Sequence, residues 1–290
     1  MKIKSSSIWI CLLLCLLTAG CREREELPEG NAVYFWRTDL KLDSTERTFL
    51  QQYHINKVYC RYFDVVINDE SVGPVPNATI NFSDTLPAGV EIIPTVYITE
   101  GCMHGTGQKE LADKIVRRIR QMNETNNIKN VLEIQIDCDY TANSRKTYYE
   151  FLEMVRRLWG QKLSTTIRLH QLSMEAPPAD YGVLMLYNTG DPRKWTERNP
   201  ILDIRDVQPY VRHLDAYPLP LAAAYPVFSW LRVIQGVNIE HTVEAQEVLN
   251  VKQMVEKKRP DLSHAIITYH LDKENINRYK PQTYEKIYHH

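Results

Sequence analysis

Hydrophobic and polar positions follow two alternating patterns from about residue 32 onward. Short, nearly continuous apolar runs, typical of buried strands, precede longer segments in which apolar residues recur every three or four positions, as on one helix face. Eight apolar runs predict strands, at residues 32–38, 57–67, 91–99, 131–141, 162–172, 182–190, 219–230 and 264–271. Helices are predicted at 43–53, from about 108, at 143–159, at 203–217 with an interruption near Pro209, at 242–257 and at 284–288.

The regular alternation of strands and helices limits the fold class. A (β/α)8 barrel of the TIM type closes eight parallel strands into a ring and places a helix after each strand. The alternative is an open, doubly wound sheet, which favours a glycine-rich phosphate-binding turn after its first strand. The segment after the first predicted strand, RTDLKLDS, contains no glycine. The pattern therefore predicts an α/β fold with one TIM-type barrel domain at 32–290.

The N-terminus has the pattern of an export signal. Two lysines precede an apolar run at 8–17, and small residues precede Cys21. The stretch LTAGC resembles a bacterial lipobox, which implies a lipoprotein signal peptide at 1–21 and a lipidated Cys21. Residues 22–31 then form a polar tether, whose acidic residues resemble surface-export signals of Gram-negative lipoproteins. We therefore expect a cell-envelope protein, lipid-anchored to the outer membrane; ordinary signal-peptidase cleavage and an uncleaved anchor are the alternatives.

The composition of the chain limits the kinds of partner that it is expected to bind. The chain is 43% hydrophobic and 24% charged, with a formal net charge of −1, so it lacks the basic surface that nucleic-acid binding requires. The mature cysteines, Cys60, Cys102 and Cys138, each lie in or just after a predicted strand and are expected to be buried small hydrophobes. Cys102 and His104 would supply only half of a metal site. No metal and no other cofactor is predicted.

Two carboxylates end the fourth predicted strand, which reads VLEIQIDCDYT. Gln135, Asp137 and Asp139 share one face of a strand, while the residues between them face the other way. In a barrel, binding and catalytic sites lie where strands end at the C-terminal face. Polar and aromatic side chains are predicted at the same level of other strands, where they would suit carbohydrate binding. These are Trp36, Arg61, Glu100, His170, Tyr187, Asn188, Trp230 and His270.

Two short motifs resemble those of glycoside hydrolase family 18, the chitinases and endo-N-acetylglucosaminidases. IQIDCDY is similar to that family's fourth-strand D-x-x-D-x-D-x-E, and MLYN at 185–188 is similar to its M-x-Y-D. The resemblance implies that Asp139 is the catalytic acid, that Asp137 orients the sugar acetamido group, and that Tyr187 stabilises it. Gln135 and Asn188 are amides where the motifs have acids. Along its whole length the sequence is similar to an uncharacterised family of exported bacterial barrel proteins.

These features support two functions. The first is a glycoside hydrolase that acts on N-acetyl-amino-sugar-containing glycans by substrate-assisted acid catalysis. The alternative is a non-catalytic glycan-binding lipoprotein on a degenerate hydrolase barrel, because Asp139 is one methylene shorter than the glutamate it replaces. In a third interpretation Asp137 and Asp139 are structural and hold the barrel rim. His170 and His270 are expected to line the barrel mouth.

Overall fold

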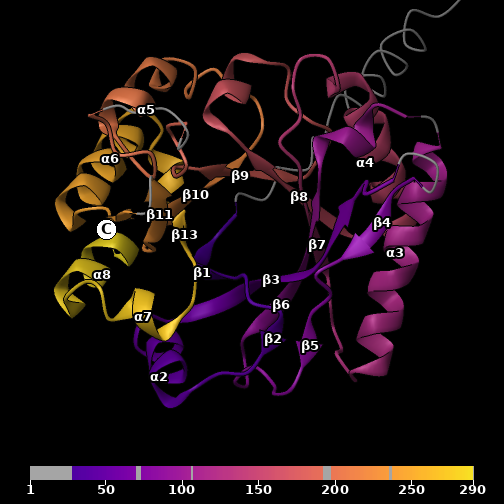
Figure 1. Cartoon of the computed structure of the whole chain (residues 1–290), viewed down its shortest axis with the longest axis horizontal. Coiled ribbons are helices and arrows are strands. Elements are labelled where there is room, and N and C mark those ends of the chain that lie inside the picture. Colours follow the sequence, from indigo (N-terminus) through magenta and orange to yellow (C-terminus); the bar gives the residue numbers. More distant parts are fainter. Residues whose placement is uncertain (1–27, 70–72, 106, 192–196, 235–236, 290) are drawn as a thin grey trace, which may run out of the picture.

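A computed structural model describes residues 28–69, 73–105, 107–191, 197–234 and 237–289. Its centre is a closed ring of eight parallel strands (Figure 1). These strands are β1 (Gly30–Phe35), β3 (Ile55–Val66), β6 (Glu91–Ile98), β7 (Glu133–Asp137), β8 (Lys162–Ile167), β9 (Tyr181–Met185), β10 (Leu221–Pro226) and β13 (Ala265–Tyr269). The ring is closed because β1 pairs in parallel with both β3 and the last strand, β13.

Helices surround the ring, as the helical periodicity of the sequence predicts. They are α2 (Ser44–Gln52), α3 (Gln108–Thr125), α4 (Arg145–Trp159), α5 (Ile204–Val211), α6 (Ala245–Lys258), α7 (Lys273–Ile276) and α8 (Pro281–Tyr288). In α4, Tyr148, Phe151, Leu152 and Val155 form a fully buried stripe against the barrel. The helix ends at Gly160, whose φ of 76° is a left-handed conformation that glycine adopts without strain.

Shorter strands and 3-10 helices lie in the connections between the strands of the ring. Short strands are β2 (Asp39–Leu40), β4 (Val75–Asn77), β5 (Asn81–Phe82), β11 (Trp230–Ile234) and β12 (Val237–His241). Short 3-10 helices are η1 (Glu100–Met103), η2 (Leu169–Ser173) and η3 (Pro260–His264). The antiparallel pair β11–β12 is inserted between β10 and α6, and η1 and η2 follow the C-terminal ends of β6 and β8.

The TIM-type barrel predicted from the sequence is confirmed, but several predicted strands are too long at their C-terminal ends. Strand β7 stops at Asp137, so Asp139 lies in the following loop, and β8 stops at Ile167, so His170 lies in η2. Strand β9 stops at Met185; Asn188, with a φ of 52°, turns the chain away after it. The apolar pattern continues past each end because the first loop residues are also buried, so burial alone does not mark where pairing stops.

The predicted signal peptide at 1–21, with Cys21, and most of the tether lie outside the described residues, although β1 already begins at Gly30. Among the described residues, no helix is both long and apolar enough to cross a bilayer. Cys60, Cys102 and Cys138 are buried and unbridged, as expected for small core residues.

Candidate active site

Alternate side chains of β7 point into the barrel and form polar layers. At the lowest level, Glu133 accepts hydrogen bonds from the Ser164 and Tyr181 hydroxyls, and burial raises the pKa of its carboxyl group. One level higher, Gln135 accepts a hydrogen bond from the Tyr34 hydroxyl at 2.9 Å. Gln135 is fully buried, so the structure places it beneath the mouth in contact with other residues, and not against a substrate as the sequence suggested.

Asp137 occupies the next level and is 3% exposed. It accepts a hydrogen bond from Thr166 Oγ1 at 2.7 Å. Burial raises the pKa of Asp137 to about 6; the nearby Arg168 guanidinium opposes this rise, and the Asp139 carboxylate adds to it. Asp137 is therefore a buried carboxyl group that exchanges its proton near neutral pH.

Asp139 lies one level above, at the mouth, with a half-exposed side chain. Its Oδ1 atom accepts a hydrogen bond from Nε of Arg168, forming an ion pair. The same guanidinium approaches Asp137, with Arg168 Nη2 3.8 Å from Asp137 Oδ1. One arginine therefore bridges both aspartates, Asp137 at the end of β7 and Asp139 in the loop that follows it.

Strand register explains why Arg168 lies there. Parallel pairing puts Gln135 beside Ser164 and Ile136 beside Thr165. Continuing by two residues on each strand places Asp137 beside Thr166, and just beyond the strand ends the same direction of the two chains brings Asp139 to Arg168. The sequence analysis missed Arg168, although its signal was present: Arg168 is a charged residue that directly follows the apolar end of β8, two positions after Thr166.

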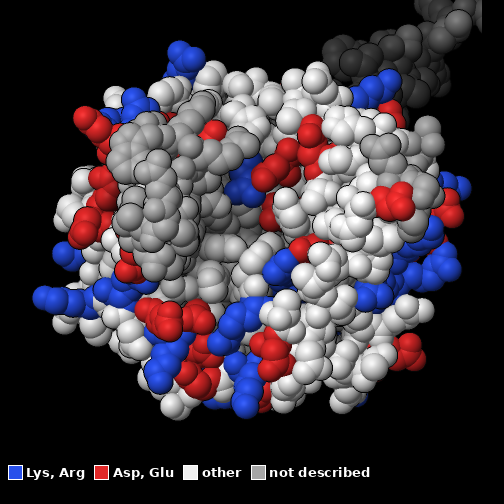
Figure 2. Space-filling view, in the orientation of Figure 1, with Lys and Arg blue, Asp and Glu red and all other residues white. Residues whose placement is uncertain are grey.

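The ion pair forms one wall of a cavity of about 340 Å³ at the mouth. The space-filling view shows the hollow, in which acidic and basic side chains adjoin (Figure 2). Three predicted site residues besides Asp139 line this cavity, namely His170, Tyr187 and Asn188. The other lining residues are Arg168, Leu169, Met185, Thr189 and Tyr210.

Tyr187 is the lining residue whose hydrogen-bonding capacity is least used. Its ring is 4% exposed and stacks on Tyr269, with a centroid distance of 4.7 Å. Its hydroxyl is buried and has no hydrogen-bond partner among the described residues. Burial raises the pKa of Tyr187, so the hydroxyl keeps its proton. An unpaired buried donor costs about 1–3 kcal/mol, and a ligand that accepts this hydrogen bond would remove the penalty.

Aromatic and basic residues extend the mouth on the side of β1, β3 and β13. Trp36 packs against Tyr269 at 5.7 Å, and the Arg61 guanidinium lies 5.6 Å from the Trp36 ring centroid. Arg61 also forms a two-pronged ion pair with Asp64, in which Nε is 2.7 Å from Oδ1. The structure thus brings Trp36 and Arg61 together, because Phe35 at the end of β1 pairs with Cys60 inside β3 and each is followed by one of these residues.

The remaining predicted residues have different surroundings. Glu100 accepts hydrogen bonds from Thr141 and Ser144 at 2.7 and 2.8 Å, and thereby fastens the loop that contains Asp139. These bonds lower the pKa of Glu100. His270 contacts Asn275, and its Nδ1 atom is unpartnered among the described residues; burial lowers the pKa of the ring. Trp230 begins β11, and its side chain lies outside the described part of the structure.

Within the described residues, no group of three or more histidine, cysteine, aspartate or glutamate side chains is arranged to hold an ion. The chemistry that the mouth can perform with its own residues is hydrogen bonding, ring stacking and proton exchange.

Comparisons with known proteins agree with this description of the fold. No family model matches the chain, and no curated protein matches it. A chitinase from Chromobacterium violaceum has a TM-score of 0.57 at 11% identity, covering 89% of this chain and 98% of that chain. The GH18 chitinase ChiB from Flavobacterium johnsoniae has a TM-score of 0.53 at 8% identity, covering 91% and 94%. A GH113 beta-1,4-mannanase has a TM-score of 0.50 at 12% identity, covering 87% and 93%.

At these identities the likeness shows the fold alone. The protein has a TIM-type barrel, the fold that it shares with these solved structures. The structural neighbours include chitinases of family 18, the family that the two short sequence motifs resemble.

Proposed function

We propose that the barrel mouth binds glycans that contain N-acetyl amino sugars, and that this binding is the protein's main activity. The observation that supports it best is the unpartnered Tyr187 hydroxyl, which is buried in the wall of the same cavity as the Arg168–Asp139 ion pair. An acetamido carbonyl is an uncharged acceptor that would pair with this hydroxyl, while the charged pair would bind sugar hydroxyls. Fold likeness to chitinases supports a glycan ligand.

The same ion pair argues against rapid hydrolysis. A general acid must reach the leaving oxygen of its substrate, and Oδ1 of Asp139 is already engaged as the acceptor of a hydrogen bond from Arg168. The neutral Gln135, at a level where the family motif has an acid, cannot supply the proton that a general acid donates. Recognition without cleavage therefore fits the geometry better than catalysis does.

Hydrolysis is the second candidate, and the raised pKa of Asp137 favours it. In this mechanism the substrate's own acetamido group attacks the anomeric carbon, Asp137 orients that group, and Asp139 protonates the leaving oxygen. A ligand would first have to separate Arg168 from Asp139.

The N-terminal sequence pattern bears on where the protein is located. We propose lipidation of Cys21 and attachment of the barrel to the outer membrane of the bacterial envelope. The motif LTAGC and the polar residues that follow it support this location.

A calorimetric titration with N-acetylglucosamine oligomers and matched glucose oligomers tests the binding, while product analysis scores cleavage separately. We expect preference for the N-acetylated series, and Tyr187→Phe should weaken it roughly tenfold, the effect of one buried hydrogen bond. Tyr225→Phe is the control, because the Tyr225 hydroxyl is also buried and without a partner in the described part of the chain, but does not line the cavity. Equal affinity for both series, or equal effects of the two substitutions, would contradict the proposal.

A further inference from the structure

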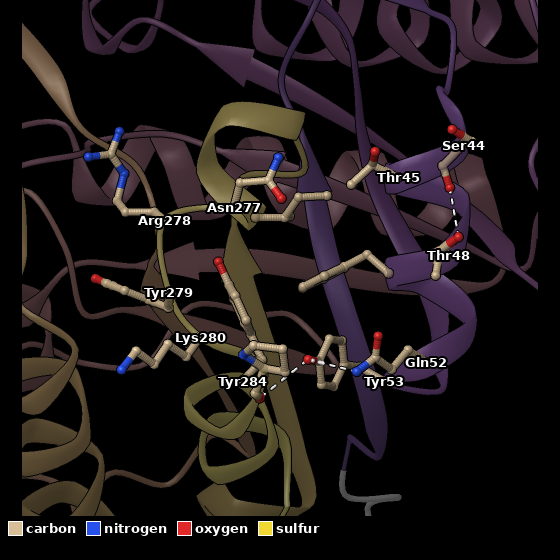
Figure 3. Close-up of a pocket in the computed structure, with 13 residues that line it drawn as sticks. Ser44, Thr45, Thr48, Gln52, Tyr53, Asn277, Arg278, Tyr279, Lys280 and Tyr284 are labelled. Atoms are coloured by element: carbon tan, nitrogen blue, oxygen red, sulfur yellow. Dashed lines mark hydrogen bonds between the residues drawn. The ribbon is translucent and has the colours of Figure 1, made fainter.

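A second concavity lies on the flank of the barrel. It is a groove of about 640 Å³ between α2 and residues 276–284, and it shares no lining residue with the mouth cavity. Figure 3 shows α2 on one side and the segment joining α7 to α8 on the other. Its volume is typical of small-molecule sites, which occupy roughly 300–1,000 Å³.

Neutral polar groups form the two walls. Ser44, Thr48 and Gln52 are exposed and follow each other at four-residue spacing, so they lie along one face of α2. Asn277 is exposed on the opposite wall, and its side chain points toward α2 in Figure 3. The Asn277 carboxamide and the Thr45 hydroxyl make no hydrogen bonds with other described residues, so both remain available to a ligand.

Aromatic rings form the base of the groove and fix its width. Phe49 packs on Tyr53 at 4.8 Å and on Tyr284 at 4.9 Å. The Tyr53 hydroxyl donates to the Pro281 carbonyl at 3.3 Å and accepts a hydrogen bond from Gln52 at 3.1 Å. These contacts join α2 directly to the start of α8, so the two walls are held at a defined separation.

The charge of the groove limits what it can bind. No acidic residue is among those that line it. Its two cations, Arg278 and Lys280, extend to the side away from α2 (Figure 3), and Arg278 bonds to Ser229. A ligand between the walls would therefore meet hydroxyl and carboxamide groups, while the rings of Phe49, Tyr53 and Tyr284 are buried against one another beneath it. Uncharged groups that both donate and accept hydrogen bonds match a neutral saccharide, which presents many hydroxyl groups.

We propose that this groove is a second glycan-binding site, specific for neutral saccharides and independent of the mouth. Its ligand belongs to the same chemical class as the proposed ligand of the mouth. The two sites use different residues, so either can exist without the other.

Hydrogen exchange read by mass spectrometry separates the two sites within one experiment. The mature protein is incubated with hexamers of N-acetylglucosamine, glucose or mannose, and exchange is followed in peptides spanning 44–53, 276–284 and the mouth segments 139–142 and 186–190. We expect at least one hexamer to slow exchange in 44–53 and 276–284. Protection there without protection at the mouth supports the groove even if the proposed mouth function fails.

Two variants make the test specific. Gln52→Ala combined with Asn277→Ala removes a polar group from each wall. This double variant should need at least a tenfold higher ligand concentration to reach the same protection of the groove peptides. Gln51→Ala is the matched control, because Gln51 is an exposed neighbour on α2 that does not line the groove. Thermal melts confirm that each variant is folded. Absence of protection with all three hexamers, or protection unchanged in the double variant, would overturn the proposal.

Discussion

Replacing Arg168 with glutamine tests whether its positive charge stabilises the buried carboxylate of Asp137. The guanidinium is the cation between Asp137 and Asp139, and it opposes the burial that raises the pKa of Asp137. Without it, Asp137 remains buried beside Thr166 with no compensating charge. Asp139 is half exposed and is hydrated by solvent, so most of the loss comes from Asp137.

The structure sets the size of the effect. Removing one partner of a buried ion pair costs about 3–5 kcal/mol. The 3.8 Å separation between Arg168 and Asp137 favours the lower end, so we expect Arg168→Gln to lose about 3 kcal/mol at pH 7.5. For a barrel of this size that loss corresponds to a fall in Tm of roughly 6 °C.

The loss should depend on pH with a defined sign. Because the pKa of Asp137 is about 6 in the folded protein, above its ordinary value, the folded state retains this proton more strongly than the unfolded chain does. Its contribution to stability is therefore full in acid and is lost as pH rises through about 6. Removing Arg168 raises the pKa of Asp137 further, so the variant should differ least from wild type near pH 4.5 and most above pH 7.

Urea denaturation at pH 4.5 and 7.5 measures this difference, and a second substitution identifies its cause. Asp137→Asn keeps the acceptor oxygen for Thr166 but removes the charge, so it should restore most of the stability lost in Arg168→Gln at pH 7.5. A loss of the same size at both pH values would refute the reasoning. So would a double variant no more stable than Arg168→Gln alone.

Four other outcomes are expected. Tyr187→Phe should raise the free energy of unfolding by about 1 kcal/mol in urea denaturation, because it removes a buried hydroxyl without a partner; a loss of stability would contradict this. If product analysis shows glycan cleavage by the wild type, Asp139→Asn should reduce turnover roughly a hundredfold or more while affinity is retained. Cys21→Ser should release the protein from membrane fractions, and continued membrane association would indicate another kind of anchor. Iodoacetamide at pH 8 should leave the folded protein unmodified but label Cys60, Cys102 and Cys138 in urea, because burial raises the pKa of all three thiols.

The barrel could be predicted from sequence because its signal is local and repeated. Each strand is a short apolar run, each helix has its own apolar stripe, and β7 was recognised although it contains Gln135 and Asp137. The shared face of Asp137 and Asp139 followed from the two-residue period of a strand. These inferences needed only neighbouring residues.

The chemistry of the mouth could not be predicted in the same way. Asp139 and Arg168 are separated by 29 positions, and their contact depends on the register between β7 and β8. The exposure of Gln135 depends on Tyr34, which approaches it from across the barrel. A motif places a side chain on a face, whereas the assembled ring determines which neighbour neutralises or buries it.

Closure of the ring also affects how the chain folds. The pairs that join β1 to β13, such as Gly30 with Ala265, connect residues near the two ends of the domain. The last ladder cannot form until residues 265–268 of β13 have been synthesised, and such distant contacts slow folding. Until then β1 and β10 each present an unpaired edge that can recruit another chain. A growing chain that lacks its last strand therefore exposes two sheet edges at once, and its risk of aggregation lasts until β13 fills the gap between them.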